Sequence, residues 1–576
     1  MEVADIKVSG DKNYSISYQA EKTTDKIVGE GTLLKEGSGN FILNVLNELK
    51  GGTVVRGGCV IMEKADSPNA FGSKVSLEGG GIGMAISDNK NTLKFSAASI
   101  VVPDKSTGAI TAGRYVYLLN EFGGKGQLTI YSGGERVGFT EDFAGKTNMA
   151  GLTGFEGELL VGANNNEALS PGYKAVFLNT TKKFDDFVAA GNFSGDLYGV
   201  DSTFVYTKVT LLEGAGFTSG SGNRCYAIGE LNAEEGGWLG GYVKNSTSPD
   251  ITYAVGYSNT DVTTPVAIFD PGKKSYNWVR LIKTGTGTYT FTHVNESPAA
   301  VFKGLFVNSG RAYINIPVTE TGVALDRVTK APAAMTIYAN AVGGGNGRLV
   351  GGIAVEGGKL EVGYMGIGEL VLADINGETQ KSPLTVKDGG IVEFELASAT
   401  SYDKLTTNNV ATFNGNKIIV KAAESFDIKN GDTFTILDAA VVSAGDTYEI
   451  EYQGFPAGLT FTAERQEYQS GTKIEGEGEE ATEVPVMGYK IILTANGSGT
   501  GTGIEVAETA EEVVVYAQDG SIVVNGVDVE NVVVVNNQGI PVANSNSTVV
   551  PMNAMEGLYI VKIKTSKGIV VKKIVL

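Results

Sequence analysis

The feature that most constrains this chain is a repeated unit of two short, alternating strands joined by a glycine corner. Residues 29–62 and residues 281–314 both place an apolar pair and a lysine before Gly-(Ser/Thr)-Gly, then continue into a strand and a second glycine corner. Shorter copies occur at 126–137, 348–362 and 384–396. One such unit cannot bury its own apolar face, so the copies must stack, which predicts a β-solenoid.

The repeats predict how the chain is divided. Residues 1–385, at about 20–25 residues per coil, would make about 15–19 coils and a rod on the order of 70–90 Å long. Residues 386–495 are predicted to be the last coils and a cap, with an acidic, solvated hairpin loop or linker at 473–485. A polar linker at 496–503 then leads to a Val-rich antiparallel β-sandwich at 504–576.

Charge and hydropathy exclude several classes of partner. The 576 residues carry 46 Lys and Arg against 65 Asp and Glu, and this net charge of −19 disfavours nucleic acid and anionic lipid surfaces. No apolar run is long enough to predict a transmembrane segment. The start of the chain lacks the basic and apolar regions of a signal peptide, so an exported protein is expected to be a mature or trimmed form.

The residues that usually carry metal and nucleophile chemistry are scarce. His293 is the single histidine, so we expect no histidine-based metal centre, no other metal site and no cofactor. Cys59 and Cys225 are too few for a disulfide framework and are interpreted as small buried side chains. A disulfide between them would require a fold that brings their Cα atoms within about 7 Å.

The repeats resemble a known family. Cys59 and Val60 depart from its pattern, which usually has Thr and Leu there. The matching residues are Gly31, Thr32, Leu33, Lys35, Gly37, Gly39, Gly51, Gly52, Thr53 and Val54. The segment is similar to the autotransporter-associated β-strand repeat, and the resemblance implies a right-handed parallel β-helix. Residues 384–495 look like the closing coils of such passengers.

The last seventy or so residues resemble the type A C-terminal sorting domain of the type IX secretion system. The matching residues are Val535, Gly539, Val542, Gly557, Leu558, Tyr559, Ile560, Val561, Lys562, Lys572, Lys573, Ile574, Val575 and Leu576. This resemblance implies a Gram-negative bacterium, an Ig-like sandwich, and export across the outer membrane by the secretion machinery. It assigns the sorting signal to Gly557, Tyr559, Lys562, Lys572 and Lys573.

Parallel β-helices include polysaccharide lyases and hydrolases, so carboxylates in loops are candidate catalytic groups. Candidate carboxylates are Asp185 with Asp186, and Glu234 with Glu235 beside Trp238. Adjacent charged residues are more often a solvated turn, so we expect no catalytic site.

Aromatic residues near predicted loops suggest binding instead, because exposed rings stack on sugars. These candidates are Tyr173, Trp238, Tyr242 and Trp278. The sequence therefore predicts a non-catalytic secreted or cell-surface stalk or adhesin that binds glycans or host proteins. Two alternatives remain open: a β-helical polysaccharide lyase or hydrolase, and a non-catalytic C-terminal part of a larger secreted enzyme.

Overall fold

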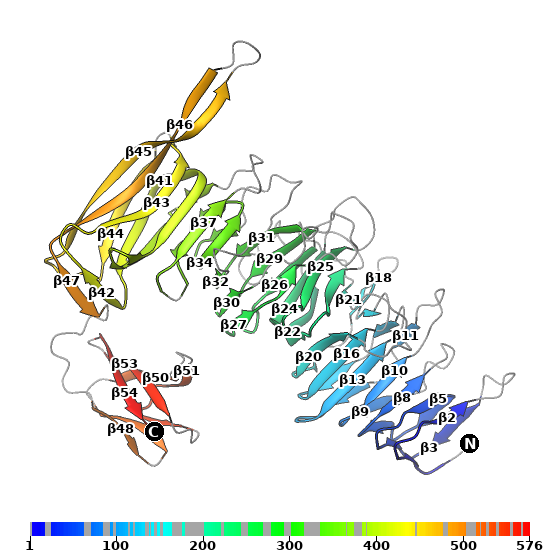
Figure 1. Cartoon of the computed structure of the whole chain (residues 1–576). Coiled ribbons are helices and arrows are strands. Elements are labelled where there is room, and N and C mark those ends of the chain that lie inside the picture. Colours follow the sequence, from blue (N-terminus) through cyan, green and yellow to red (C-terminus); the bar gives the residue numbers. More distant parts are fainter. Residues whose placement is uncertain are drawn as a thin grey trace.

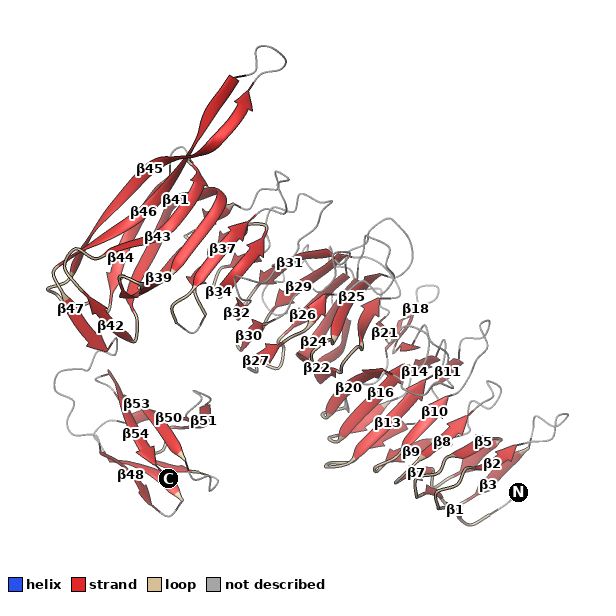
Figure 2. Cartoon of the chain, in the orientation of Figure 1, coloured by secondary structure: helices blue, strands red, loops and turns tan. Residues whose placement is uncertain are grey.

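The chain is built from strands. The computed structural model contains no helix among the residues that it describes, so the all-β prediction is confirmed (Figure 2). The described residues are 3–17, 25–62, 71–84, 93–95, 99–112, 116–118, 121–132, 137–138, 140–142, 147–149, 154–163, 175–178, 201–219, 224–242, 251–268, 278–292, 301–315, 335–364, 366–373, 383–387, 389–443, 446–475, 482–502, 514–518, 520–525, 529–536, 541–552, 557–565 and 568–575.

One long parallel sheet runs through the solenoid (Figure 1). Its described strands are β2 (Tyr14–Ser17), β5 (Phe41–Asn44), β8 (Cys59–Met62), β10 (Gly81–Met84), β13 (Thr107–Ala112), β16 (Gln127–Ser132), β20 (Glu158–Ala163), β22 (Asp201–Leu211), β24 (Arg224–Ala233), β26 (Ile251–Val255), β29 (Trp278–Lys283), β31 (Val301–Val307), β33 (Met335–Tyr338), β35 (Ile353–Glu356) and β38 (Leu384–Lys387). At a strand spacing of about 4.8 Å this stack extends about 65–70 Å. The solenoid prediction is confirmed in this coarse form.

Two further parallel sheets and one strand pair complete the first half of the solenoid. Their strands are β1 (Ile6–Val8), β4 (Leu33–Lys35), β7 (Thr53–Val55), β9 (Lys74–Leu77), β12 (Ser99–Val102) and β15 (Phe122–Gly124); β11 (Leu93–Phe95), β14 (Val116–Leu118), β17 (Val137–Gly138), β21 (Ala175–Leu178), β23 (Gly216–Ser219), β25 (Trp238–Tyr242) and β28 (Ala267–Ile268); and β3 (Lys26–Gly29) with β6 (Leu46–Leu49). A separate antiparallel pair joins β18 (Thr140–Asp142) to β19 (Thr147–Met149).

In the second half the parallel sheets continue and then give way to antiparallel strands. The strands here are β27 (Val262–Thr264), β30 (Thr288–Phe291), β32 (Gly310–Asn315), β34 (Ala341–Val350), β36 (Lys359–Val362), β37 (Glu369–Ala373), β39 (Ile391–Ser398), β40 (Ser401–Tyr402), β41 (Lys404–Ala422), β42 (Ser425–Ile428), β43 (Thr433–Val441), β44 (Thr447–Gln453), β45 (Thr460–Glu475), β46 (Thr482–Asn496) and β47 (Gly499–Thr502). Antiparallel pairing appears between β39 and β40, and then where β46 pairs with β43 and β45.

One large apolar cluster extends through the described part of the solenoid, from Ile27 to Ala495. A second, smaller cluster contains Val205, Cys225, Ala227, Ala254 and Ile282. Alternation along the strands explains this: in β36, Leu360 and Val362 are buried while Lys359 and Glu361 face outward.

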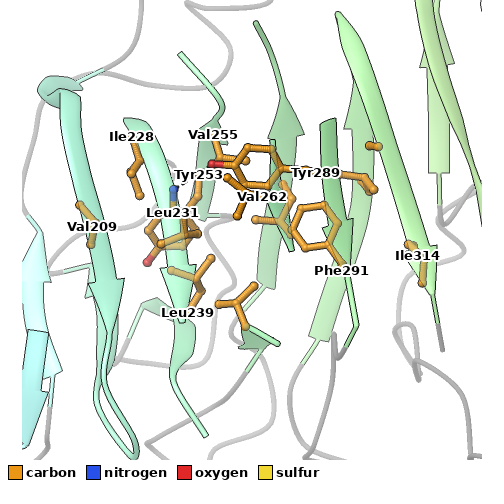
Figure 3. Packing of buried hydrophobic residues seen from close by; sticks show 14 of the residues in the cluster. Val209, Ile228, Leu231, Leu239, Tyr253, Val255, Val262, Tyr289, Phe291 and Ile314 are labelled. Carbon is orange, nitrogen blue, oxygen red and sulfur yellow. Dashed lines mark hydrogen bonds between the residues drawn. The ribbon is translucent and has the colours of Figure 1, made fainter. Parts of the chain in front are cut away.

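Buried tyrosines in this core use backbone partners for their hydroxyls (Figure 3). The backbone N–H of Leu231 donates to the Tyr289 hydroxyl at 2.8 Å, and the Tyr253 hydroxyl donates to the carbonyl of Gly240 at 2.8 Å. A buried phenol needs such a partner, because an unpaired hydroxyl in an apolar core is destabilising. Tyr253 and Tyr289 can therefore be buried in an apolar core without leaving their hydroxyls unpaired.

Lys35, at the end of β4, is a buried lysine at a coil corner. It is 1% exposed, and its Nζ donates to the carbonyls of Glu36, Gly37 and Gly57 at 2.7, 2.9 and 3.1 Å. Gly37 has a φ of 75°, which exposes the corner carbonyls to the lysine. The side chain thus joins the corners of two successive coils.

Lys283, at the end of β29, repeats this arrangement in a distant coil. Its Nζ donates to the carbonyls of Thr284, Gly285 and Ser309 at 2.6, 2.9 and 3.2 Å, and Gly285 has a φ of 72°. Burial lowers the pKa of Lys283 to about 8, and the charge of Asp261 acts in the opposite direction. The hydrogen bonds of the two lysines therefore correspond, as the repeat of 29–62 and 281–314 predicted. The coil positions differ, because β4 belongs to the sheet of β1 and β7 whereas β29 belongs to the long sheet.

A cluster of aromatic rings lies at the last coil, where β42, β44 and β45 end the solenoid (Figure 1). The Phe455 ring lies 4.9 Å from Phe461 and 5.9 Å from Phe426, and Tyr452 stacks on Phe461 at 5.1 Å. These rings pack against the end of the apolar core. They cover a surface that would otherwise face water, as a terminal cap must.

The two cysteines are both thiols, Cys59 half-buried and Cys225 buried. They lie on β8 and β24, which are six strand steps apart in the long sheet. At about 4.8 Å per step the separation is about 29 Å. This distance is far above the disulfide limit, so the two thiols of one chain cannot be joined.

The C-terminal module has its own core, formed by two antiparallel sheets. The first contains β48 (Val514–Gln518), β49 (Ser521–Asn525) and β52 (Val549–Pro551), and the second contains β51 (Pro541–Ser545), β50 (Val529–Asn536), β53 (Leu558–Thr565) and β54 (Gly568–Val575). The buried members of this core include Ile522, Val534 and Val561.

Candidate functional site

An extended polar network lies on the outward face of the sheet that contains β32, β34, β36, β39 and β41. We call it the outer-face network. Its members are Arg311, Tyr313, Lys359, Glu361, Glu393, Glu395 and Lys421. The strand register places Tyr313, Gly344, Glu361 and Glu393 in one row across successive coils. Alternation then turns their neighbours Leu360 and Val392 into the core.

At one end of the network, a tyrosine and an arginine share one carboxylate. The Tyr313 hydroxyl donates to Glu361, and Arg311 Nη1 lies 3.2 and 3.1 Å from the two Glu361 oxygens. Arg311 also donates to the Tyr313 oxygen at 2.9 Å. Gly344 lies between them in the row, and the absence of a side chain there lets Tyr313 and Glu361 meet across two strand steps.

At the other end, two lysines bridge three carboxylates. Lys359 Nζ lies 2.6 Å from Glu361 and 3.0 Å from Glu393. Lys421 Nζ lies 2.8 Å from both Glu393 and Glu395. Positive and negative groups therefore alternate along the solenoid axis over four strand steps, from β32 to β41.

The electrostatics of the network favour the charged forms of Glu361 and Lys421. Burial acts to raise the pKa of Glu361, but hydrogen bonds from Lys359 and Tyr313 and the nearby positive charges outweigh it and lower the pKa. Burial acts to lower the pKa of Lys421, but its bonds to Glu393 and Glu395 raise the pKa overall. Glu361 is thus held ionised at neutral pH.

The chemistry open to this network follows from those charges. Glu361 and Glu393 are carboxylates on neighbouring coils, as a glycoside hydrolase requires. A general acid, however, needs a raised pKa so that it holds a proton at working pH. The lowered pKa of Glu361 does not fit that role. The lysine bridges instead connect neighbouring coils and offer fixed charges to a polar ligand. Sequence analysis missed this set, although the alternating charges of KLEV and VEFEL were a signal.

Asp403, just before β41, is a nearby carboxylic acid whose pKa is raised, in contrast to the lowered pKa of Glu361. It is fully buried, and its two oxygens accept the backbone N–H groups of Gly368 and Glu395 at 2.7 Å each. Burial raises the pKa of Asp403 from its ordinary 3.8 to about 8, against the opposing effect of those two hydrogen bonds.

A pH dependence of stability follows from Asp403. The pKa of Asp403 is raised in the folded state, so its protonated form contributes to the free energy of unfolding. This contribution is complete below about pH 4 and is lost as pH rises toward 8, at up to about 1.4 kcal/mol per pH unit. Urea midpoints measured from pH 4 to pH 9 should show a downward slope in the parent that is reduced in Asp403→Asn. Equal slopes in the two proteins would contradict the assignment.

Trp238, proposed from the sequence as a binding residue, begins β25 and is 6% exposed. Its indole N–H donates to the carbonyl of Gly214 at 3.3 Å, and its ring lies against Gly216, where a Cβ would come within 2.3 Å of it. The ring therefore packs inside the solenoid wall. It offers little surface for stacking on a sugar.

The other candidates from the sequence are placed as follows. Glu234 and Glu235 are exposed in the turn before β25, and Glu234 accepts the N–H of Glu213 at 3.1 Å. Tyr242 and Trp278 lie on β25 and β29, but only their backbones are described. The residues outside the described part are Tyr173, Asp185, Asp186 and His293.

The predicted sorting-signal residues lie together at the end of the C-terminal module. Gly557 precedes β53, Tyr559 is buried on it, and Lys562 is exposed on it. Lys572 is exposed on β54, and Lys573 is described there only as backbone. The register pairs Val561 with Lys572 and Ile560 with Lys573, so the motif forms two neighbouring strands.

Nowhere in the described part is a helix long and apolar enough to cross a membrane. Within the same part, no group of three or more His, Cys, Asp or Glu side chains could hold a metal ion. No protein-family model matches the chain, and no curated protein matches it.

Proposed function

We propose that this chain is a non-catalytic, secreted or cell-surface stalk or adhesin of a Gram-negative bacterium. In this proposal a right-handed β-helix forms the stalk and presents loops to glycans or host proteins. The C-terminal module is an Ig-like sorting domain that engages the type IX secretion machinery and directs export.

The observation that carries the proposal is the outer-face network. Its carboxylates are neutralised in chains that run along the solenoid axis, and Glu361 has a lowered pKa. The buried lysines Lys35 and Lys283 add links between successive corners in the same direction. Such axial links stiffen a stack of coils, and a stiff rod suits the presentation of binding loops at a distance.

A second function is favoured by one specific observation. Glu361 and Glu393 are in register on adjacent coils, and Tyr313 and Arg311 adjoin Glu361. A polysaccharide hydrolase needs at least one such pair of neighbouring carboxyl groups. The enzyme alternative therefore names these residues as its candidates.

The test combines a glycan-array screen with assays for reducing sugars and unsaturated products. The expected result is binding without turnover, unchanged in Glu361→Gln and Glu393→Gln. Glu449→Gln is the matched control, because Glu449 is an exposed carboxylate on the neighbouring β44. Turnover that falls at least about a hundredfold in either network variant, and not in the control, would establish the enzyme instead.

The aromatic residues Tyr173, Tyr242 and Trp278 remain the proposed glycan contacts, with Trp238 the least suited because of its burial. Replacing each of these residues by Ala and repeating the glycan-array screen measures how much that side chain contributes to glycan binding. A stacking ring should weaken binding by about fivefold to tenfold on removal, a loss on the order of 1 kcal/mol.

A further inference from the structure

The hairpin of β45 and β46 extends beyond the sheet that supports it (Figure 1). β46 pairs with β43 only from Tyr489 to Thr494. From Tyr468 opposite Gly488 to Glu475 opposite Thr482, the two strands pair with each other. Near the base of this stretch one backbone hydrogen bond, from the Val442 N–H to the Met487 carbonyl at 2.7 Å, joins it to the chain that follows β43. We call residues 468–475 and 482–488 the ribbon.

The root of the ribbon is fixed to the solenoid by side chains. The Tyr468 hydroxyl donates to Asp438 at 2.5 Å, and Lys490 Nζ lies 3.4 Å from the same carboxylate and 4.9 Å from the Tyr468 ring. The Ser470 hydroxyl lies within hydrogen-bonding distance of the carbonyl of Ala440. The ribbon is therefore held outward at a defined place on the sheet.

Above this root the ribbon exposes apolar side chains. Ile474 is 72% exposed and Met487 is 39% exposed. An isolated two-stranded ribbon is marginal in water, and a chain that only needed to reverse direction could have turned at its root. A projecting ribbon with uncovered apolar side chains suits a contact with another molecule.

The charge of the ribbon indicates what that molecule must offer. Residues 468–487 contain five glutamates and one lysine. Glu475 and Glu483 are exposed beside the apolar residues. A fitting surface is therefore basic and partly apolar.

The chain itself carries such a surface. Residues 557–576 contain five lysines and no acidic residue, against a net charge of −19 for the whole protein. Lys562 and Lys564 are exposed and lie opposite Val571 and Ile569 on β54, which is an edge strand of the described sheet. Lys564 Nζ also lies 3.1 Å from Glu530 on β50, so part of its charge is already paired.

We propose that the ribbon of one copy docks on the β53–β54 surface of a second copy. The two patches are different, so the contact is head-to-tail and can continue from copy to copy. A ribbon of this size buries a small interface, and the attraction is largely between exposed charges. The association is therefore weak at low concentration and sensitive to salt.

The test is sedimentation velocity of the full chain between about 1 and 100 μM, at low and at high salt. The weight-average mass should rise with concentration at low salt and fall back to the monomer at high salt. Glu475→Lys with Glu483→Lys, or Lys562→Glu with Lys564→Glu, should weaken association at least about tenfold, because each places like charges together. Combining all four changes should restore it.

The control is Lys50→Glu with Lys429→Glu, two exposed lysines elsewhere that change the net charge equally. This control should associate about as the parent does, apart from a small general effect of charge. A protein that stays monomeric at every concentration overturns the proposal. The proposal is also overturned if the quadruple variant does not regain the association of the parent. It is overturned as well if the protein associates as strongly after residues 468–487 are replaced by Asn-Gly.

Discussion

Replacing Lys283 by methionine is expected to destabilise the solenoid by about 3 kcal/mol, the loss expected when a buried, hydrogen-bonded charge is removed. Methionine fills a similar volume but leaves the carbonyls of Thr284, Gly285 and Ser309 without their donor. Chemical denaturation followed by circular dichroism measures the shift. Lys35→Met should behave alike, because its Nζ has the same three kinds of partner.

The matched control is Lys50→Met. Lys50 is 71% exposed and pairs only with the exposed Glu30 among the described contacts, so its loss should change stability by no more than about 0.5 kcal/mol. Lys283→Arg should not rescue the site, because a planar guanidinium is larger than the ammonium that donates to the three corner carbonyls at 2.6, 2.9 and 3.2 Å. A Lys283→Met protein as stable as Lys50→Met would show that the corner lysine is dispensable.

The corner lysines show what could be predicted from the sequence. The motif is local: the lysine ends a strand, and Gly37 or Gly285 turns the next carbonyls toward it. A hydrogen-bond pattern that depends only on neighbouring residues recurs wherever the same sequence motif recurs. The corresponding corners of 29–62 and 281–314 could therefore be predicted without knowing how other coils stack.

The outer-face network could not be predicted in the same way. Its contacts depend on register between coils of unequal length, as the pairs Phe41–Val60 and Ile82–Ile110 illustrate. Tyr313 reaches Glu361 only because Gly344 stands between them, and this row is not visible as a spacing in the sequence.

The aromatic candidates illustrate a related difficulty. Trp238 lies in NAEEGGWLGGY, where surrounding glycines and acids indicate a turn and hence exposure. In the structure the turn contains Glu234 and Glu235, and a strand begins at Trp238. The Trp238 ring packs on Gly216. A glycine beside an aromatic residue can mark a close packing contact as well as a loop.

The segment at 473–485 was predicted to be an acidic hairpin loop or linker, and the structure contains a hairpin there. The strands are much longer than the charge pattern suggested, because β45 and β46 pair from Thr460 opposite Asn496 to Glu475 opposite Thr482. Many residues of β45 are exposed, so burial periodicity is weak along it and the strand is hard to recognise from sequence.

Deletion of residues 568–576 is expected to unfold the C-terminal module. β54 pairs with β53 along its whole length, from Leu558 opposite Val575 to Thr565 opposite Gly568. Its removal takes Ile574 from the module core and leaves β53 with an unpaired edge. A small module with one such core has only a few kcal/mol of stability to lose.

If the module is the sorting domain that it resembles, the same deletion should trap the passenger in the periplasm. The test expresses parent and deletion in a host with the type IX machinery and compares surface and periplasmic fractions. Surface display should fall at least about tenfold, because an unfolded module cannot present the strand pair that carries the terminal lysines. Lys572→Ala is the companion variant, since Lys572 is exposed and its loss should leave the module folded. Trapping of Lys572→Ala as well would assign recognition to the lysine itself, whereas trapping of the deletion alone would assign it to the folded sheet. Unchanged display of the deletion protein would make the module an accessory domain and remove the basis for export by this route.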